Sequence, residues 1–142
     1  MVNKLKKTIM KVKKYPFVTC SKEVEDNIIY VEYAENLIVN MAIAKELVAS
    51  RLDFAENQKH YVIIDVSNVK QVTSEAKKYL QSKEAGLKDI LAGAFIASNN
   101  ISALFANIFA KTPGITSTFV ASKKDALIWI NEVKKKQVTE FK

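Results

Sequence analysis

A single stretch, residues 61–80, constrains the fold more than any other part of the chain. It opens with a β-branched run at residues 62–64, stops at Asp65 and continues into Ser67 and Asn68, which favour turns. This pattern predicts a buried strand that ends in a polar loop.

A helix is predicted directly after this loop. Thr73 or Ser74 can cap its N-terminus, and Glu75 places a negative charge in the first turn, where the helix dipole favours one. We expect the helix to run to Ala85 and to end near Gly86, because glycine adopts the C-terminal capping conformation at little cost.

Apolar periodicity divides the rest of the chain into alternating strands and helices. The expected strands are residues 17–20, 28–33, 60–64, 90–97 and 116–120, and the expected helices are residues 40–54, 74–85, 101–112 and 122–136. Strands that alternate with helices predict the α/β class. We therefore expect one domain built on a mixed sheet of about five strands with four helices, in the order ββαβαβαβα.

The first two strands are expected to form an antiparallel hairpin. Pro16 favours an edge position for the first of them, because proline cannot donate a ladder hydrogen bond. The second strand alternates, with one set of side chains on each face of the sheet. These sets are Ile29, Val31 and Tyr33 on one face, and Ile28, Tyr30 and Glu32 on the other.

Two of the helices carry clear N-terminal caps. Asn40 can cap the first helix, and Ser122 with Asp125 forms a capping box at the start of the last one. In the first helix, the charged side chains Lys45 and Arg51 are expected to remain in solvent.

Most of the net charge of +7 is carried by residues 1–14, which contain lysines and no acidic residue. We interpret residues 1–15 as a lysine-rich arm, flexible or partly ordered and frayed up to Tyr15, residues 16–137 as the α/β domain and residues 138–142 as a tail. A solvated arm explains the basicity without a nucleic-acid partner. The single arginine, Arg51, supports this view, since arginine is the better bidentate phosphate ligand.

Several kinds of chemistry are not expected. The single cysteine, Cys20, allows no internal disulfide and suits a reducing cytoplasm as a buried, apolar residue. A lone histidine, His60, at the start of a strand gives no zinc site. The glycines lie too far apart for a phosphate-binding loop, and no apolar run reaches the ~20 residues of a membrane helix. We expect a cytoplasmic protein without a cofactor or a membrane-spanning segment.

The segment from Asp65 to Ala76 resembles the signature of STAS domains, the family of sulfate-transporter cytoplasmic domains and anti-sigma factor antagonists. In that family a strand ending in an acidic or amide residue leads to a turn whose serine is phosphorylated by a partner kinase. Here Glu75 stands where that serine is expected, and Ser74 is its neighbour. The resemblance implies the STAS fold and a role in binding a regulatory partner.

The chain is also similar to uncharacterised bacterial STAS-like or SEC14-like proteins related to the sporulation antagonist fold. The shared positions are residues 75–79 of the second helix, Asn107 and Phe109 of the third, Pro113, and residues 126–129 of the last helix. This second resemblance adds an apolar small molecule or a lipid as an implied ligand.

Two functions follow as hypotheses. The first is a non-enzymatic regulatory module that binds a protein partner, with homodimerisation left open, through a surface that we call the rim. The rim consists of Asp65, Ser67, Asn68, Thr73, Ser74, Glu75 and Lys78, with Thr73 or Ser74 as the phosphorylation site. The alternative is a carrier or sensor of an apolar small molecule or lipid. Its pocket would contain Leu104, Phe105, Ile108 and Phe109.

An enzyme that uses Asp65 with Ser67 or Lys70 ranks last, because no further base, metal ligand or phosphate loop accompanies them. A carboxylate directly after a strand more often accepts hydrogen bonds from the backbone of the following turn. We therefore expect Asp65 to stabilise its turn and the protein to have no catalytic activity.

Overall fold

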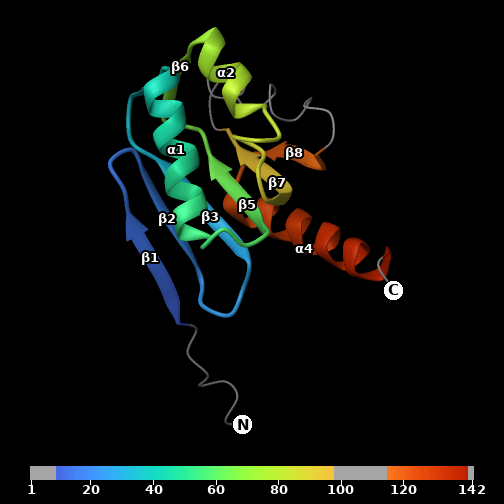
Figure 1. The fold of residues 1–142 in the computed structure, drawn as a ribbon. Helices are drawn as coiled ribbons and strands as arrows, with labels where there is room; N and C mark the ends of the chain where they lie inside the picture. Colours follow the sequence, from blue (N-terminus) through green and yellow to red (C-terminus); the bar gives the residue numbers. More distant parts are fainter. Residues whose placement is uncertain (1–8, 98–114, 141–142) are drawn as a thin grey trace.

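The computed structural model describes residues 9–97 and 115–140. Six strands form a mixed sheet in the order β1-β2-β3-β5-β7-β8 (Figure 1). Their bounds are β1 (Met10–Lys14), β2 (Val18–Glu23), β3 (Ile28–Tyr33), β5 (His60–Asp65), β7 (Ile90–Ile96) and β8 (Ser117–Val120). A smaller parallel pair consists of β4 (Leu37–Val39) and β6 (Val69–Val72). The described helices are α1 (Met41–Phe54), α2 (Ser74–Leu80) and α4 (Lys123–Glu140).

The main sheet is antiparallel at one end and parallel at the other. Strands β1, β2 and β3 pair antiparallel, whereas β3, β5, β7 and β8 are parallel neighbours. Parallel neighbours need crossover connections, and helices α1 and α2 lie in the connections that lead to β5 and β7. The predicted α/β class, the hairpin of the early strands and the mixed sheet are confirmed.

Each face of the sheet has its own apolar core. Ile29 and Val31 pack with α1 and α2 on one face, while Ile28 packs with α4 on the other. The alternation predicted for β3 is therefore correct. In Figure 1, α1 lies in front of the sheet and α4 behind it.

Local hydrogen bonds explain where two helices begin. The Oδ1 atom of Asn40 accepts a hydrogen bond from the backbone N–H of Ile43 at 2.9 Å, which caps α1. The Oγ atom of Ser122 accepts one from the N–H of Asp125 at 3.2 Å, at the start of α4. Both caps agree with the sequence, because each satisfies an N–H group that has no partner within the helix.

The expected fraying up to Tyr15 is wrong. Residues Met10–Lys14 form β1, which pairs with β2 along its full length, so β2 is an interior strand and not the edge. Side chains fix the new strand to α1, since Lys13 Nζ and the Tyr15 hydroxyl both reach Asp53 Oδ2, at 3.1 and 2.7 Å. Lysine is compatible with this position, because its stem can pack on the sheet while its ammonium group reaches solvent.

Three further expectations need correction or lie outside the described residues. The loop after β5 contains the short strand β6, which pairs with β4. Helix α2 ends at Leu80, before a series of turns, and does not continue to Ala85. The predicted third helix and its pocket residues Leu104, Phe105, Ile108 and Phe109 lie outside the described part of the chain, so they stay predictions.

Gly86 is required by a close backbone approach. A Cβ atom at this position would lie 1.8 Å from the carbonyl oxygen of Leu80, whereas one at Gly93 would lie 3.1 Å from a methyl group of Val62. A side chain at Gly86 therefore forces the backbone after α2 to move, while the Val62 side chain can adjust.

We expect Gly86→Ala to lower the free energy of unfolding by about 3 kcal/mol or more, and the control Gly93→Ala by about 1 kcal/mol, because backbone overpacking cannot relax. Urea denaturation of both variants measures the difference. Equal losses would show that the loop after Leu80 is free to move.

Candidate partner-binding rim

The turn after β5 is built around the carboxylate of Asp65. Its Oδ1 atom accepts a hydrogen bond from the backbone N–H of Ser67 at 2.9 Å, and the hydroxyl of Tyr30 donates to Oδ2 at 3.5 Å. Burial, followed by the charge of Asp65, raises the pKa of Tyr30 to about 12, so this phenol stays a donor at neutral pH. The expected role of Asp65 in stabilising its turn is confirmed.

Asn68 connects the rim to the smaller sheet. Its carbonyl oxygen accepts from the N–H of Leu37 at 3.1 Å, and its side-chain amide donates to the carbonyl of Tyr33 at 3.4 Å. These bonds bring the end of β3 and the start of β4 to the loop after β5. The rim is therefore part of the hydrogen-bonded framework.

The second part of the rim is the start of α2. Thr73 Oγ1 accepts from the N–H of Ala76 at 3.2 Å, and its backbone N–H donates to Val39 at 2.9 Å. Thr73 is thus the N-cap, as one of the two predicted alternatives had it. The side chains of Ser74, Glu75 and Lys78 are exposed.

The structure separates the predicted rim into two groups. Asp65, Ser67 and Asn68 precede β6, and the other members follow it. Because β6 has 4 residues, at about 3.3 Å per residue the two groups lie on the order of 13 Å apart along this strand. The rim is therefore an extended surface, and it does not gather its side chains around one reacting atom.

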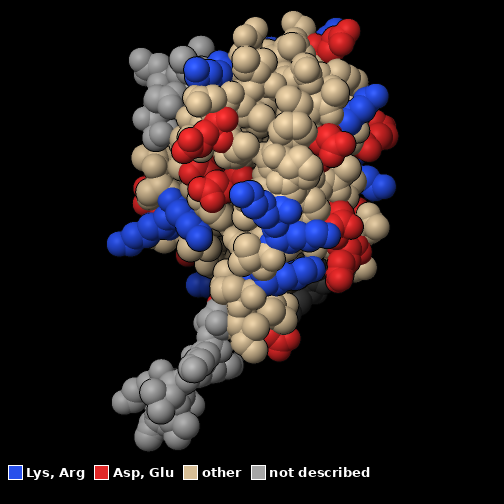
Figure 2. All heavy atoms as spheres, turned by 90° about the vertical axis from the view of Figure 1, so that its left-hand side faces the viewer, with Lys and Arg blue, Asp and Glu red and all other residues tan. Residues whose placement is uncertain are grey.

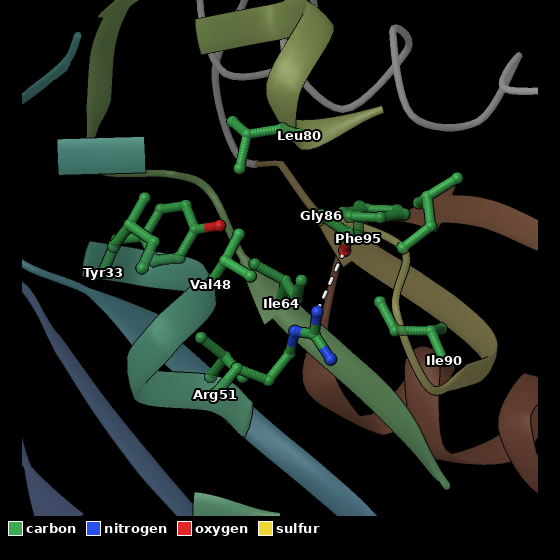
Figure 3. Close-up of a pocket in the computed structure, with 11 residues that line it drawn as sticks. Tyr33, Val48, Arg51, Ile64, Leu80, Gly86, Ile90 and Phe95 are labelled. Carbon is green, nitrogen blue, oxygen red and sulfur yellow. Dashed lines mark hydrogen bonds between the residues drawn. The ribbon is translucent and has the colours of Figure 1, made fainter. Parts of the chain in front are cut away.

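A buried polar pair that the sequence did not predict lies on the α1 face of the sheet. Arg51 Nη1 donates to His60 Nε2 at 2.8 Å and to the carbonyl oxygen of Lys88 at 2.9 Å. Its Nη2 atom donates to the carbonyl oxygens of Gly86 at 3.1 Å and Ala85 at 3.4 Å. Figure 3 shows the guanidinium group pointing from α1 toward Gly86.

The neutral form of His60 completes this network. His60 Nδ1 lies 2.7 Å from the carbonyl oxygen of Gln58, which can only accept, so Nδ1 carries the proton and Nε2 accepts from Arg51. Burial lowers the pKa of His60 to about 4 and that of Arg51 to about 10, so at neutral pH only the arginine is charged.

The placement of Arg51 in solvent was wrong, and His60 is enclosed, with only 2% of its surface exposed. Arg51 is 4% exposed and lies one and two helical turns from Leu47 and Ala44, on the buried stripe of α1. The periodicity placed residue 51 inward, but its charge favoured solvent. The missed signal was the spacing, since an arginine can be buried where carbonyl groups and other acceptors pair with its donors.

The described residues form a small cavity and a larger, more open groove on opposite faces of the sheet. A cavity of about 30 Å³ beside Arg51 is lined by Tyr33, Leu80 and Phe95, among others, and has room for about one or two water molecules. A more open groove of about 230 Å³ lies on the α4 face, between Met10 of β1 and Leu127 of α4. The first is too small for a lipid.

Among residues 9–97 and 115–140, no group of three or more His, Cys, Asp or Glu side chains is placed to hold a metal ion. No helix in the described part of the chain is both long and apolar enough to cross a membrane.

The architecture places the chain among proteins with a SpoIIAA-like fold. A crystal structure of an uncharacterized protein from the DUF3478 family of Shewanella loihica PV-4, described as having this fold, is similar with a TM-score of 0.53 and 14% sequence identity. The match covers 88% of this chain and 98% of that chain. The predicted resemblance to STAS and anti-sigma factor antagonist proteins is confirmed for the fold.

The chain belongs to the family described as Domain of unknown function (DUF7793), whose model matches residues 22–134. No curated protein matches the chain. The family therefore adds no activity to the fold.

We expect acid to destabilise the protein through His60. Its pKa is about 4 in the folded chain and about 6.5 in the unfolded chain, so the unfolded state binds more protons between these values. Stability is complete above the unfolded pKa and falls by up to about 3 kcal/mol as the pH drops to the folded pKa. Chemical denaturation at several pH values measures this slope.

The control for this titration is His60→Gln, whose amide oxygen can still accept from Arg51 but does not titrate. All other titrating groups contribute equally in both proteins. If the two pH profiles run parallel, the fold does not depress the pKa of His60.

We expect Arg51→Met to lower the free energy of unfolding by about 3 kcal/mol or more, because it leaves buried carbonyl oxygens without donors. Lys45→Met, on the exposed side of the same helix, is the matched control, with an expected change within about 0.5 kcal/mol. Thermal and urea unfolding measure both. Similar stability of the two variants would mean that the Arg51 hydrogen bonds add nothing to the fold.

Proposed function

We propose that this protein is a non-enzymatic regulatory module that binds a protein partner through the rim. The observation that carries the proposal is that neighbouring side chains at the start of α2 have different roles. Thr73 uses its side chain to cap the helix, whereas Ser74, Glu75 and Lys78 are exposed beside it. The backbone there is held by the hydrogen bond from the N–H of Thr73 to Val39 of β4, so exposed polar side chains are presented on a fixed support.

The arrangement of the rim supports binding better than catalysis. Asp65 is committed to its turn, and β6 separates it from the hydroxyl groups of the α2 start. A reaction would need a nucleophile and a base within hydrogen-bond reach of each other. A partner surface needs only exposed groups at fixed positions, and the SpoIIAA-like fold is consistent with such a role.

Ser74 is the preferred phosphorylation site in this proposal. The Thr73 oxygen already accepts a hydrogen bond that starts α2, whereas the Ser74 side chain is exposed. A phosphate adds about 1.5 to 2 negative charges next to Glu75, which changes the charge that a partner meets. Phosphorylation would then regulate docking and leave the fold intact.

We expect the double variant Ser74→Arg, Lys78→Glu to lower the amount of captured partner by about tenfold or more. It adds a positive charge at one rim position and reverses the charge at another, and mismatched charges in an interface are strongly unfavourable. Affinity capture from a lysate of the source organism, with quantitative mass spectrometry, compares it with the unaltered chain. Lys124→Glu, at an exposed position of α4, is the control and is expected to keep the partner. Identical partner sets in all three samples would remove the rim proposal.

Two substitutions of Ser74 test the phosphorylation step. We expect Ser74→Asp and Ser74→Ala to differ in the amount of captured partner, with the alanine variant resembling the unphosphorylated chain. Intact-mass measurement of the bait reports whether a phosphate is present. Equal capture by both variants, from a bait that carries no phosphate, would leave a constitutive rim without a switch.

A further inference from the structure

Strand β1 is the outer strand of the main sheet. Among the described residues, its only strand neighbour is β2. An outer strand presents unpaired backbone groups, which form a template for another extended chain. Natural proteins protect such edges or use them to bind partner strands.

The ladder shows which backbone groups face outward. Ile9 accepts a hydrogen bond from Val24, and Tyr15 donates one to Val18, so the odd-numbered residues of β1 make the bonds to β2. Bonded and non-bonded pairs alternate in an antiparallel ladder. The N–H and C=O groups of the even-numbered residues, Met10, Val12 and Lys14, therefore point to the free edge.

The two faces of β1 differ in chemistry. On the α4 face, the apolar side chains of Met10 and Val12 are 49% and 62% exposed. On the α1 face, Lys11 and Lys13 lie beside the end of α1, where Lys13 contacts Asp53 at 3.1 Å. An added strand would thus meet Met10, Val12 and the exposed Lys14 on the α4 face, and Lys11 and Lys13 on the α1 face.

The charge of this edge favours an acidic strand over a second copy of β1. Lys11 lies directly opposite Lys22 in the ladder, and like charges in this position repel. The carboxylate of Glu56 offsets this repulsion only weakly, because it lies 4.0 Å from Lys11 Nζ and is exposed. Two copies of β1 would add more lysines to this repulsion. Figure 2, which faces this side of the molecule, shows a group of lysine side chains with acidic ones above it and at its right end.

We propose that the outer edge of β1 binds an extended acidic segment of a partner protein, which adds a seventh strand to the sheet. Its backbone pairs with Met10, Val12 and Lys14. Its acidic side chains lie beside Lys11 and Lys13, and its alternate apolar side chains lie beside Met10 and Val12. This surface is separate from the rim, so either can bind without the other.

The test uses the full chain and a labelled heptapeptide that alternates glutamate and valine, followed by fluorescence anisotropy. We expect binding that weakens as salt is added. Val12→Pro removes one outward N–H and is expected to weaken binding by about tenfold or more, while leaving the ladder to β2 intact. The control Val12→Ala keeps the N–H and is expected to weaken binding by no more than about threefold.

Amide hydrogen exchange of the unaltered chain gives an independent readout. The peptide is expected to protect the amides of Met10, Val12 and Lys14 and to leave that of Lys13 unchanged. A heptapeptide that alternates lysine and valine is expected not to bind, and the rim variant Lys78→Glu is expected to bind the acidic peptide normally.

Four results would overturn the proposal. They are no binding of the acidic peptide, equal binding of the lysine peptide, unchanged affinity in Val12→Pro, and a dimer of the free chain in sedimentation that Val12→Pro abolishes. The last result would assign the edge to a second copy of this chain. None of these results would bear on the rim.

Discussion

The structure depends on the way in which a buried guanidinium group is satisfied. Arg51 has hydrogen bonds to three backbone carbonyl groups and to the ring of His60, and no carboxylate partner in the described network. Removing this charge from water is costly, and the carbonyl groups offset the cost only while they are held in place. Arg51 thereby connects α1, the start of β5 and the connection that leads to β7. These elements cannot move apart without exposing an unpaired donor or acceptor.

The position of the rim follows from this connection. Gly86, one of the acceptors of Arg51, passes so close to the backbone of Leu80 that only a glycine fits. Helix α2 ends at Leu80 and packs against α1, so the end of α2 is fixed by the same group of contacts. Its start is fixed by the bond from Thr73 to β4. A short helix held at both ends presents Ser74 and Lys78 at defined positions, which lowers the entropy cost of binding.

The sequence predicted the parts of the fold that depend on local pattern. Strand β3 with its two faces, the cap at Asn40 and the strand at β5 each follow from a few neighbouring residues. Two of the errors share one cause, the assumption that cationic side chains stay in solvent. Because of this assumption, the lysine-rich strand β1 was not predicted. Arg51 was placed in solvent, although its spacing from Leu47 and Ala44 puts it on the buried side of α1. For the rim, the residues were identified, but their separation by β6 depends on pairing with β4, which is distant in sequence.

Helix α1 brings the two proposed surfaces into one framework. Its C-terminal end carries Asp53, whose pKa is lowered by hydrogen bonds from Tyr15 and Lys13, so this carboxylate stays charged and holds β1 in place. Its body packs against α2, which carries part of the rim. An acidic strand at β1 would compete with Asp53 for Lys13, but this contact is exposed and weak compared with the buried Arg51 network. Because the buried Arg51 network holds α1 to the loop after α2, a partner at one proposed surface is expected to leave the geometry of the other unchanged.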